Sequence, residues 1–159
     1  MNNKLKAIAN LIKPQWKVIA DVGCDIAYLS YYNYTNHLHH FFYNIDNKQG
    51  PLKLARQLHQ SVVNDAMFIC SEGLSYLKEH QINVDCCVIA GVGGYTCLKI
   101  LDNDYDGIKR YIFQIENNQE IIDDWIIHHH YQITDIKYVK DRTFNYLIYL
   151  VEKNEAIRT

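Results

Sequence analysis

The stretch IADVGCDIAYLS, residues 19–30, joins the end of an apolar run to a turn that holds two carboxylates and one glycine. The run from Lys17 to Asp21 has the length and composition of a buried strand. Gly23 lies in the turn, and Asp25 begins a segment long enough for a helix. A buried strand that passes through such a turn into a helix is the first part of a βαβ unit. The stretch therefore predicts an α/β fold in which parallel strands alternate with helices.

The chain repeats this alternation after the opening stretch. Further apolar runs of strand length lie at residues 40–46, 66–70, 85–90 and 110–116. Segments long enough for helices lie between them, at about 25–36, 48–60, 73–80, 94–103 and 118–130. Near the N-terminus, apolar residues recur with helical spacing from Leu5 to Ile12, and Pro14 ends that helix. The apolar middle strands indicate a parallel sheet that is buried on both faces.

The last part of the chain departs from this rhythm. Residues 131–140 and 143–153 are two strand-like runs joined by Asp141 and Arg142, which indicates an antiparallel hairpin. Five alternating strands and a terminal hairpin make seven. We therefore predict a Rossmann-like class I methyltransferase fold with a seven-stranded, mostly parallel sheet. A flavodoxin-like or dinucleotide-binding fold is the competing interpretation.

Length and composition restrict the protein further. The 159 residues favour one domain, 1–159, and the formal net charge of −2 argues against a protein that grips nucleic acid by bulk charge alone. No apolar run approaches the ~20 residues of a membrane span, and the N-terminus lacks the apolar region of a signal peptide. We therefore expect a cytoplasmic protein without membrane attachment.

The cysteines and histidines do not predict a disulfide framework or a metal site. The five cysteines are odd in number and irregularly spaced. The histidine runs at 37–40 and 128–130 place neighbouring side chains in different directions, so the histidines do not converge on an ion. Cys86 and Cys87 are expected to be small buried residues on opposite faces of the sheet.

Polar residues follow the predicted strands at the edge where an open parallel sheet binds its ligands. The first turn carries Asp21, Gly23 and Asp25 and lacks the G-x-G-x-x-G pattern that a pyrophosphate needs. Carboxylates repel phosphate and suit a cation. S-adenosylmethionine carries a sulfonium and an ammonium and no phosphate, so it is the cofactor that we predict. Asp21 or Asp25 would receive its ammonium, and Gly23 would let the backbone approach.

Acids after the next strands fit the rest of that cofactor. Asp46 lies about where a carboxylate would accept hydrogen bonds from both ribose hydroxyls. Glu72 lies where an acid would accept a hydrogen bond from the adenine amino group. Each acid alone would also suit a helix N-cap or first turn. The predicted cofactor contacts are Asp21, Val22, Gly23, Asp46, Asn47, Ser71, Glu72, Gly73, Ala90 and Gly91.

The glycines after the fourth strand, residues 91–94, have two interpretations. They form either a tight strand-to-helix turn with close packing or an open floor for a flat base and the transferred methyl group. On the second interpretation Gly93 and Gly94 contact the substrate.

Several motifs, in this order, resemble the bacterial tRNA (adenine(22)-N1)-methyltransferases. The family pattern D-x-G-x-D-x-A-Y matches residues 21–28, an acid before Gly-Pro matches Asp46 with Gly50 and Pro51, and I-A-G-x-G-G matches residues 89–94. The resemblance covers nearly the whole chain and implies the fold and cofactor predicted above, with tRNA as the partner. The sequence departs from the family at Ile26 and Ser30, has Glu72 in place of Asp, and reads Gln-Ile-Glu at 114–116 in place of Q-P-N. It resembles a short form without the family's helical C-terminal extension.

The resemblance implies methyl transfer to N1 of adenine, with Asp25 and Tyr28 as the catalytic pair. Asp25 would stabilise the positive charge that develops on the base, and Tyr28 would stack on it or hydrogen-bond to it. The RNA would be held by basic residues, with Arg142 at the hairpin as the main candidate and Lys48, Lys53 and Arg56 as further ones. We expect a monomer or weak dimer. The alternatives are methylation of another RNA or a small molecule, or a cofactor- or RNA-binding module without catalysis.

Overall fold

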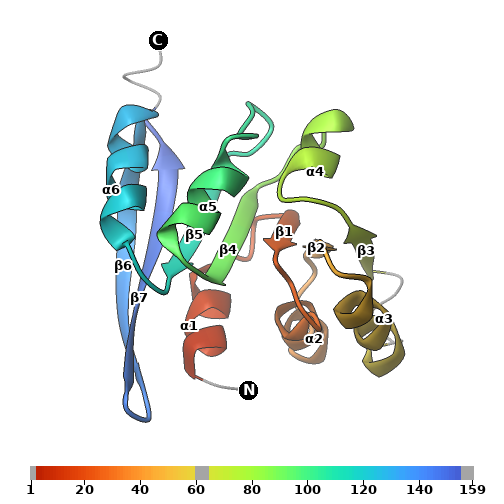
Figure 1. Cartoon of the computed structure of the whole chain (residues 1–159). Coiled ribbons are helices and arrows are strands. Elements are labelled where there is room, and N and C mark those ends of the chain that lie inside the picture. The colour runs from red at the N-terminus through yellow and green to blue at the C-terminus, as the bar shows by residue number, and fades with distance from the viewer. Residues whose placement is uncertain (1–2, 60–64, 155–159) are drawn as a thin grey trace.

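The computed structural model describes residues 3–59 and 65–154 and forms a three-layered α/β/α structure (Figure 1). The elements follow one another as α1 (Asn3–Leu11), β1 (Val18–Val22), α2 (Tyr28–Thr35), β2 (Phe41–Asp46), α3 (Gln49–Leu58), β3 (Ala66–Cys70), α4 (Ser75–Glu79), β4 (Cys86–Val92), α5 (Gly94–Leu101), β5 (Arg110–Ile115), α6 (Gln119–His128), β6 (Tyr131–Asp141) and β7 (Phe144–Lys153). Every predicted strand and helix is present, with boundaries shifted by a few residues.

The seven strands form one sheet in the order β3-β2-β1-β4-β5-β7-β6. Strands β1 to β5 pair in parallel, whereas β7 runs antiparallel to both β5 and β6. The order reverses between β1 and β4, which is the topological switch point where open α/β sheets bind ligands. The predicted sheet and its terminal hairpin are thus confirmed.

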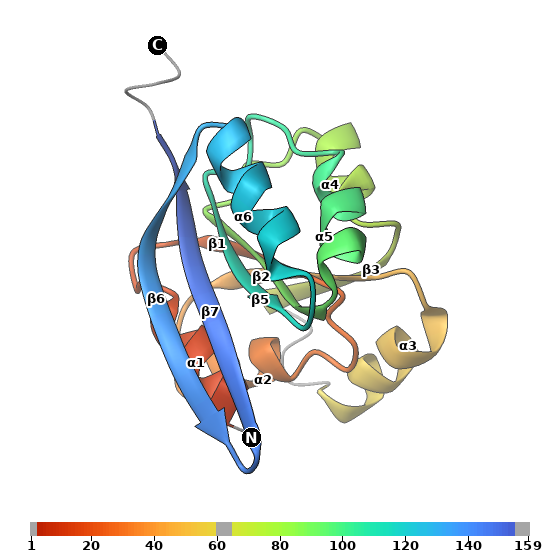
Figure 2. The ribbon, with the colours of Figure 1, turned by 60° about the vertical axis from the view of Figure 1, so that its left-hand side comes forward.

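The two faces of the sheet are covered by separate helices. Buried residues of α4, α5 and α6 pack with one face, and those of α1, α2 and α3 pack with the other (Figure 2). Cys86 belongs to the second cluster and Cys87 to the first, because successive strand residues point to opposite faces. Both cysteines are buried, as expected.

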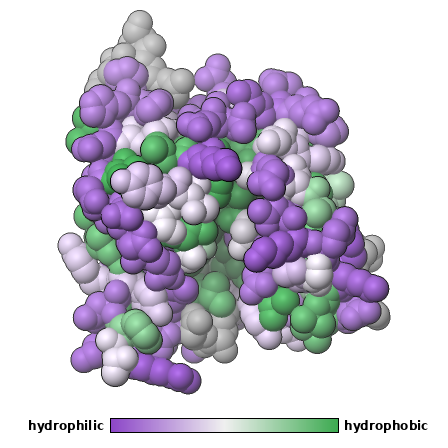
Figure 3. Space-filling model, in the orientation of Figure 1, coloured by the Kyte–Doolittle hydropathy of each residue, from purple (hydrophilic) through white to green (hydrophobic). Residues whose placement is uncertain are grey.

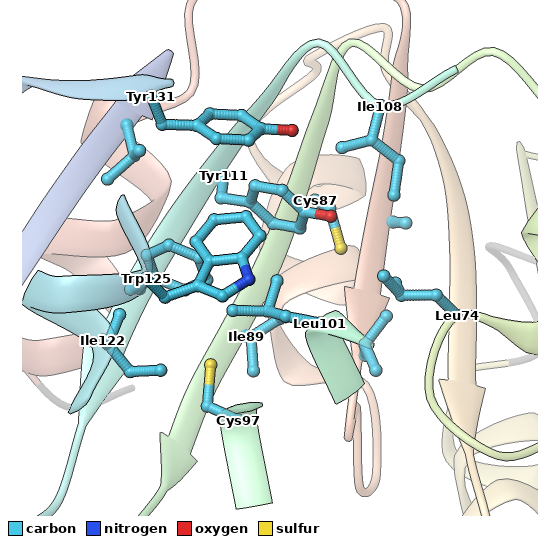
Figure 4. Close-up of a cluster of buried hydrophobic side chains, with 14 of the residues drawn as sticks. Leu74, Cys87, Ile89, Cys97, Leu101, Ile108, Tyr111, Ile122, Trp125 and Tyr131 are labelled. Atoms are coloured by element: carbon cyan, nitrogen blue, oxygen red, sulfur yellow. The ribbon is translucent and has the colours of Figure 1, made fainter. Parts of the chain in front are cut away.

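Aromatic side chains form the centre of the first cluster (Figure 4). The ring of Tyr111 contacts those of Trp125 and Tyr131, and the Tyr111 hydroxyl donates to the Asp104 carboxylate at 2.6 Å. This hydrogen bond satisfies a hydroxyl that would otherwise be buried at a cost. Hydrophilic residues cover most of the face shown in Figure 3. The hydrophobic core therefore lies against the faces of the sheet, and the ends of the strands remain available for a functional site.

The hairpin extends beyond the edge of the sheet where the parallel strands end (Figure 1). Asp141 pairs with Phe144, so Arg142 and Thr143 form its turn, and Arg142 takes the positive φ of 59° that a glycine would adopt more easily. The backbone N–H of Asn3 donates to the Asp141 carboxylate at 3.2 Å. The start of α1 is thereby fixed beside the hairpin.

Candidate functional site

A cavity of about 630 Å³ lies at the carboxyl ends of β1, β2, β3 and β4. Its walls come from the ends of these strands, from the loops that follow them, and from the helices after those loops, including the last turn of α5. The lining residues are Val22, Gly23, Asp25, Ile45, Asp46, Asn47, Lys48, Pro51, Ser71, Glu72, Gly73, Ser75, Val92, Thr96, Lys99, Ile100 and Asn103. Seven of the ten predicted cofactor contacts and Asp25 are therefore brought together in one place.

The turn after β1 is held in a conformation that exposes its backbone. Gly23 has a φ of 79°, and the N–H groups of Gly23 and Cys24 both donate to the carbonyl of Ile45, at 2.8 and 3.0 Å. Asp25 also has a positive φ, 53°. A residue with a side chain would strain the backbone at position 23, and Gly23 leaves the space above the turn open. A ligand can therefore approach the backbone here.

The Asp46 carboxylate is fixed by two backbone donors. Its Oδ2 accepts the N–H of Asp25 and its Oδ1 accepts the N–H of Lys48, each at 3.0 Å. The Asp46 carbonyl also accepts the N–H of Ser71 at 3.0 Å, which ties the ends of β2 and β3 together. A carboxylate has about four acceptor positions, so each oxygen can still accept a hydrogen bond from a ligand.

Asp21 lies at the end of β1 and is only 8% exposed. Burial raises the pKa of its carboxyl to about 7, and the negative charges of Asp46 and Asp25 raise it further. A bound cation would favour the ionised form of Asp21. Asp21 does not line the cavity itself.

The glycines in the last part of β4 and directly after it divide into two kinds, since Gly91 lies within the strand and Gly93 and Gly94 follow it. Gly91 has a φ of 77°, and its N–H donates to the buried Gln114 side chain at 2.9 Å. A Cβ at Gly94 would lie 2.3 Å from the Asn118 carbonyl oxygen, and one at Gly93 would lie 2.6 Å from Asn117 Oδ1. Close packing against the loop after β5 therefore explains the last two glycines. Neither they nor Ala90 and Gly91 line the cavity.

The two predicted catalytic residues differ in position. Asp25 lines the cavity, whereas Tyr28 at the start of α2 does not and is 47% exposed. The Tyr28 ring lies 5.7 Å from that of His59, on which Tyr31 is stacked at 4.4 Å. His59 is buried, and its Nε2 is 2.9 Å from the Ile26 carbonyl oxygen. Tyr28 thus belongs to an aromatic group beside the cavity.

The basic residues that the sequence suggested for RNA binding lie in different parts of the structure. Arg142 lies at the tip of the hairpin, outside the cavity. Lys48 lines the cavity. Arg56 donates to the Phe68 carbonyl at 2.6 Å and lies over the Phe68 ring, so it joins α3 to β3. That contact gives Arg56 a packing role.

Sequence reasoning missed the wall that α5 and the residues after it provide. Thr96, Lys99, Ile100 and Asn103 line the cavity. Their spacing of three and four residues marks one face of a helix, and this helix begins at the edge where the strands end. In the sequence, that spacing after the fourth strand would have indicated these lining residues.

Within residues 3–59 and 65–154, no three His, Cys, Asp or Glu side chains are placed to hold a metal ion. Among the same residues, no helix has the length and apolar character needed to cross a membrane.

Comparison with known proteins shows what the chain resembles. The sequence model of the family described as "Methyltransferase domain" matches residues 1–149, a range that includes every residue lining the cavity. A Mycoplasma genitalium protein named a putative tRNA methyltransferase is 29% identical over 154 residues, which cover 96% of this chain and 70% of that protein. The tRNA (adenine(22)-N(1))-methyltransferase of Bacillus subtilis is 30% identical over 140 residues, which cover 85% of this chain and 58% of that enzyme.

A solved structure is similar to this chain in its fold as well as in its sequence. TrmK of M. capricolum, in complex with S-adenosyl-homocysteine, has a TM-score of 0.88 and 29% sequence identity to this chain. The match covers 97% of this chain and 69% of the other. The resemblance therefore extends over all seven strands and both helical layers.

Proposed function

The chain belongs to the methyltransferase-domain family, and we propose that it transfers a methyl group from S-adenosylmethionine to N1 of an adenine in tRNA. It is an S-adenosylmethionine-dependent methyltransferase. The observation that supports the cofactor part of the proposal most strongly is the Asp46 carboxylate, held by two backbone donors in a cavity at the switch point. The substrate class comes from the relatives named for tRNA methylation, and adenine 22 is the position that we infer from them.

The cavity offers a partner for each part of the cofactor. Asp46 accepts hydrogen bonds from the ribose hydroxyls, and Glu72 accepts one from the adenine amino group. Asp21 and Asp25 supply the negative charge that faces the ammonium and the sulfonium. The remaining proposed contacts are Val22, Gly23, Asn47, Ser71, Gly73, Ala90 and Gly91.

Apolar residues complete the cofactor site. Val22, Ile45, Pro51 and Ile100 line the cavity and can enclose a flat base. Lys48 and Lys99 also line it, beside the three carboxylates of Asp25, Asp46 and Glu72. A cavity with an acidic floor, apolar walls and no glycine-rich phosphate loop favours S-adenosylmethionine over a dinucleotide.

The reaction that this site supports is an in-line displacement. The lone pair of adenine N1 forms the new N–CH₃ bond, the S–CH₃ bond breaks, and its electrons return to sulfur. N1 carries no proton, so no general base is needed, and orientation alone can contribute ~7–11 kcal/mol. The positive charge passes from sulfur to the base, where Asp25 stabilises it and Tyr28 stacks.

The substrate must present an unpaired or extruded base. In this proposal the backbone of Gly93 and Gly94, which packs closely against the loop after β5, contacts the base, and Arg142 binds RNA phosphate. A tRNA substrate implies action in the cytoplasm, and we expect a monomer or weak dimer.

Methylation of unmodified tRNA tests the proposal. Purified protein, tRNA transcripts and methyl-labelled S-adenosylmethionine should yield N1-methyladenosine on nucleoside analysis. A transcript in which A22 is replaced by G should not be labelled. Label in another nucleoside, or label in the G22 transcript at the normal rate, would contradict the proposed substrate position. Calorimetry with S-adenosylmethionine and with NAD separates the two cofactor classes, since only the first should bind.

A further inference from the structure

Three segments that are distant in the sequence meet beside Gly91, outside the cofactor cavity. Lys4 on α1 forms an ion pair with Glu116, which follows β5, with Nζ and Oε1 3.8 Å apart. The Lys4 ammonium also lies 5.0 Å from the centre of the Tyr146 ring on β7. The cofactor contacts proposed above do not account for this group.

The backbone of Gly91 is open toward this ion pair. A Cβ at Gly91 would have Glu116 Oε1 and Lys4 Nζ as its neighbours, each at 3.9 Å. The Gly91 N–H is bound to Gln114, so the backbone is fixed in this position. The Glu116 side chain is 41% exposed and the Lys4 side chain 20%, so the carboxylate can be reached by an incoming group. A glycine backbone, a carboxylate and an aromatic ring thus lie together, and Gly91 is itself one of the proposed cofactor contacts.

The chemistry of N1 methylation gives this carboxylate a use. When the methyl group arrives, the adenine ring becomes a cation and its N6 amino group becomes a stronger hydrogen-bond donor. An acceptor with a negative charge would bind that edge more tightly in the transition state than in the ground state. Such an interaction raises kcat and leaves substrate affinity nearly unchanged.

We propose that Glu116, oriented by Lys4, receives the N6 edge of the target adenine and stabilises the charge that methylation places on the ring. This inference rests on the proposed function and adds a second carboxylate beside Asp25. Lys4 acts as a positioning residue. Its ion pair with Glu116 fixes the carboxylate next to Gly91 before the RNA arrives, and its contact with Tyr146 fixes Lys4 in turn.

The test compares Glu116→Gln with a matched control, Glu120→Gln. Glu120 is an exposed carboxylate in the first turn of α6, four residues further along, and it does not line the cavity. Loss of a charge-assisted hydrogen bond that forms in the transition state should lower kcat of E116Q about tenfold or more. The KM for tRNA and the Kd for S-adenosylmethionine should stay within about twofold of wild type, because neither ground state uses the charge. E120Q should retain the wild-type kcat.

Glu116→Asp adds a readout that a structural role would not give. It keeps the charge, so its kcat should exceed that of E116Q although its side chain is shorter. If wild type makes N1-methyladenosine and E116Q keeps a wild-type kcat, this inference is overturned and the proposed function stands. If E116Q and E116D lose kcat equally with a raised KM, a packing role replaces the proposed one. If wild type makes no N1-methyladenosine, the proposed function fails and this inference fails with it.

Discussion

The Asp46 carboxylate accepts the backbone N–H of Asp25 at 3.0 Å, although the two residues are 21 positions apart. The bond joins the end of β2 to the turn after β1, and the second carboxylate oxygen binds the N–H of Lys48 at the start of α3. One side chain therefore shapes two walls of the cavity and also faces its interior. Residues of this kind link the stability of a site to its affinity for a ligand.

Replacing Asp46 should weaken cofactor binding more than it weakens the fold. In Asp46→Ala the cofactor ribose loses both hydrogen bonds to a charged acceptor, each worth about 1.5–3 kcal/mol, so the Kd should rise at least tenfold. The backbone donors of Asp25 and Lys48 are exposed and can bind water, so the free energy of unfolding should fall by only about 1 kcal/mol. Calorimetric titration with S-adenosylmethionine and urea unfolding measure the two effects.

Asp46→Asn separates charge from shape in the same experiment. The amide has the size of the carboxylate, but it places an NH₂ group against one of the two N–H donors. Its Kd should also rise tenfold or more. Asp124→Asn on α6, an exposed carboxylate outside the cavity, is the control and should bind as wild type does. Unchanged binding by both Asp46 variants would remove Asp46 from the cofactor site.

Asp21 should make the unliganded protein less stable as the pH rises. Its pKa is raised from 3.8 to about 7 by burial first and then by the charges of Asp46 and Asp25. The folded state therefore holds a proton that the unfolded state has released between about pH 4 and pH 7, and the free energy of unfolding falls over that window. This stabilising contribution is complete below pH 4 and is lost as the pH passes through 7.

Asp21→Asn removes the titrating group, so its stability should change less with pH than that of wild type. At pH 8 the variant should be more stable than wild type, by on the order of a few kcal/mol, and near pH 4 the two should be similar. The same variant should bind S-adenosylmethionine more weakly, because the cation loses a negative partner. Urea unfolding at pH 4.5, 6 and 8 gives the comparison, and parallel pH curves for the two proteins would contradict the assignment.

Gly94→Ala should be destabilising because the new methyl group meets backbone. Its Cβ would lie 2.3 Å from the Asn118 carbonyl oxygen, while the Gly94 N–H donates to the Asn117 carbonyl at 2.8 Å. Overpacking of this kind costs about 1–3 kcal/mol. Gly50→Ala is the matched control, since nothing lies within 4 Å of a Cβ there and α3 favours alanine by up to about 1 kcal/mol. Thermal unfolding should therefore shift in opposite directions, and a lowered Tm for both variants would argue against this packing explanation.

The sequence was sufficient to predict the strands and the residues at their ends. A parallel sheet gathers the carboxyl ends of its strands at one edge, so the position of Asp46 or Glu72 relative to a strand end implies its place in the site. Five strands follow from apolar runs, and the two strands of the hairpin follow from the break in rhythm after α6. These features are local, and a single sequence displays them directly.

The contacts that sequence reasoning did not predict depend on long-range placement. Lys4 reaches Glu116 only because α1 lies against the hairpin, and β7 brings Tyr146 there only because it inserts between β5 and β6. Nothing in the local pattern reveals either arrangement. Arg56 is a further example, because its position on a helix suggested RNA binding and did not reveal that its guanidinium donates to the Phe68 carbonyl of β3.

Arg142 should contribute to RNA binding through charge alone. It lies in the turn of the hairpin, beyond the edge of the sheet on which the site lies, and it is exposed (Figure 1). If its guanidinium binds one phosphate, Arg142→Gln should weaken tRNA binding and lower the slope of log K against log salt by about 0.9, irrespective of RNA sequence. Lys78→Gln on α4, an exposed cation far from the hairpin, should leave the slope unchanged. Filter binding at salt concentrations between about 50 and 200 mM gives the slopes. Because the cofactor site is distant from this turn, the Arg142→Gln variant should also keep the wild-type Kd for S-adenosylmethionine. A salt-dependence slope equal to that of wild type would show that the RNA binds elsewhere.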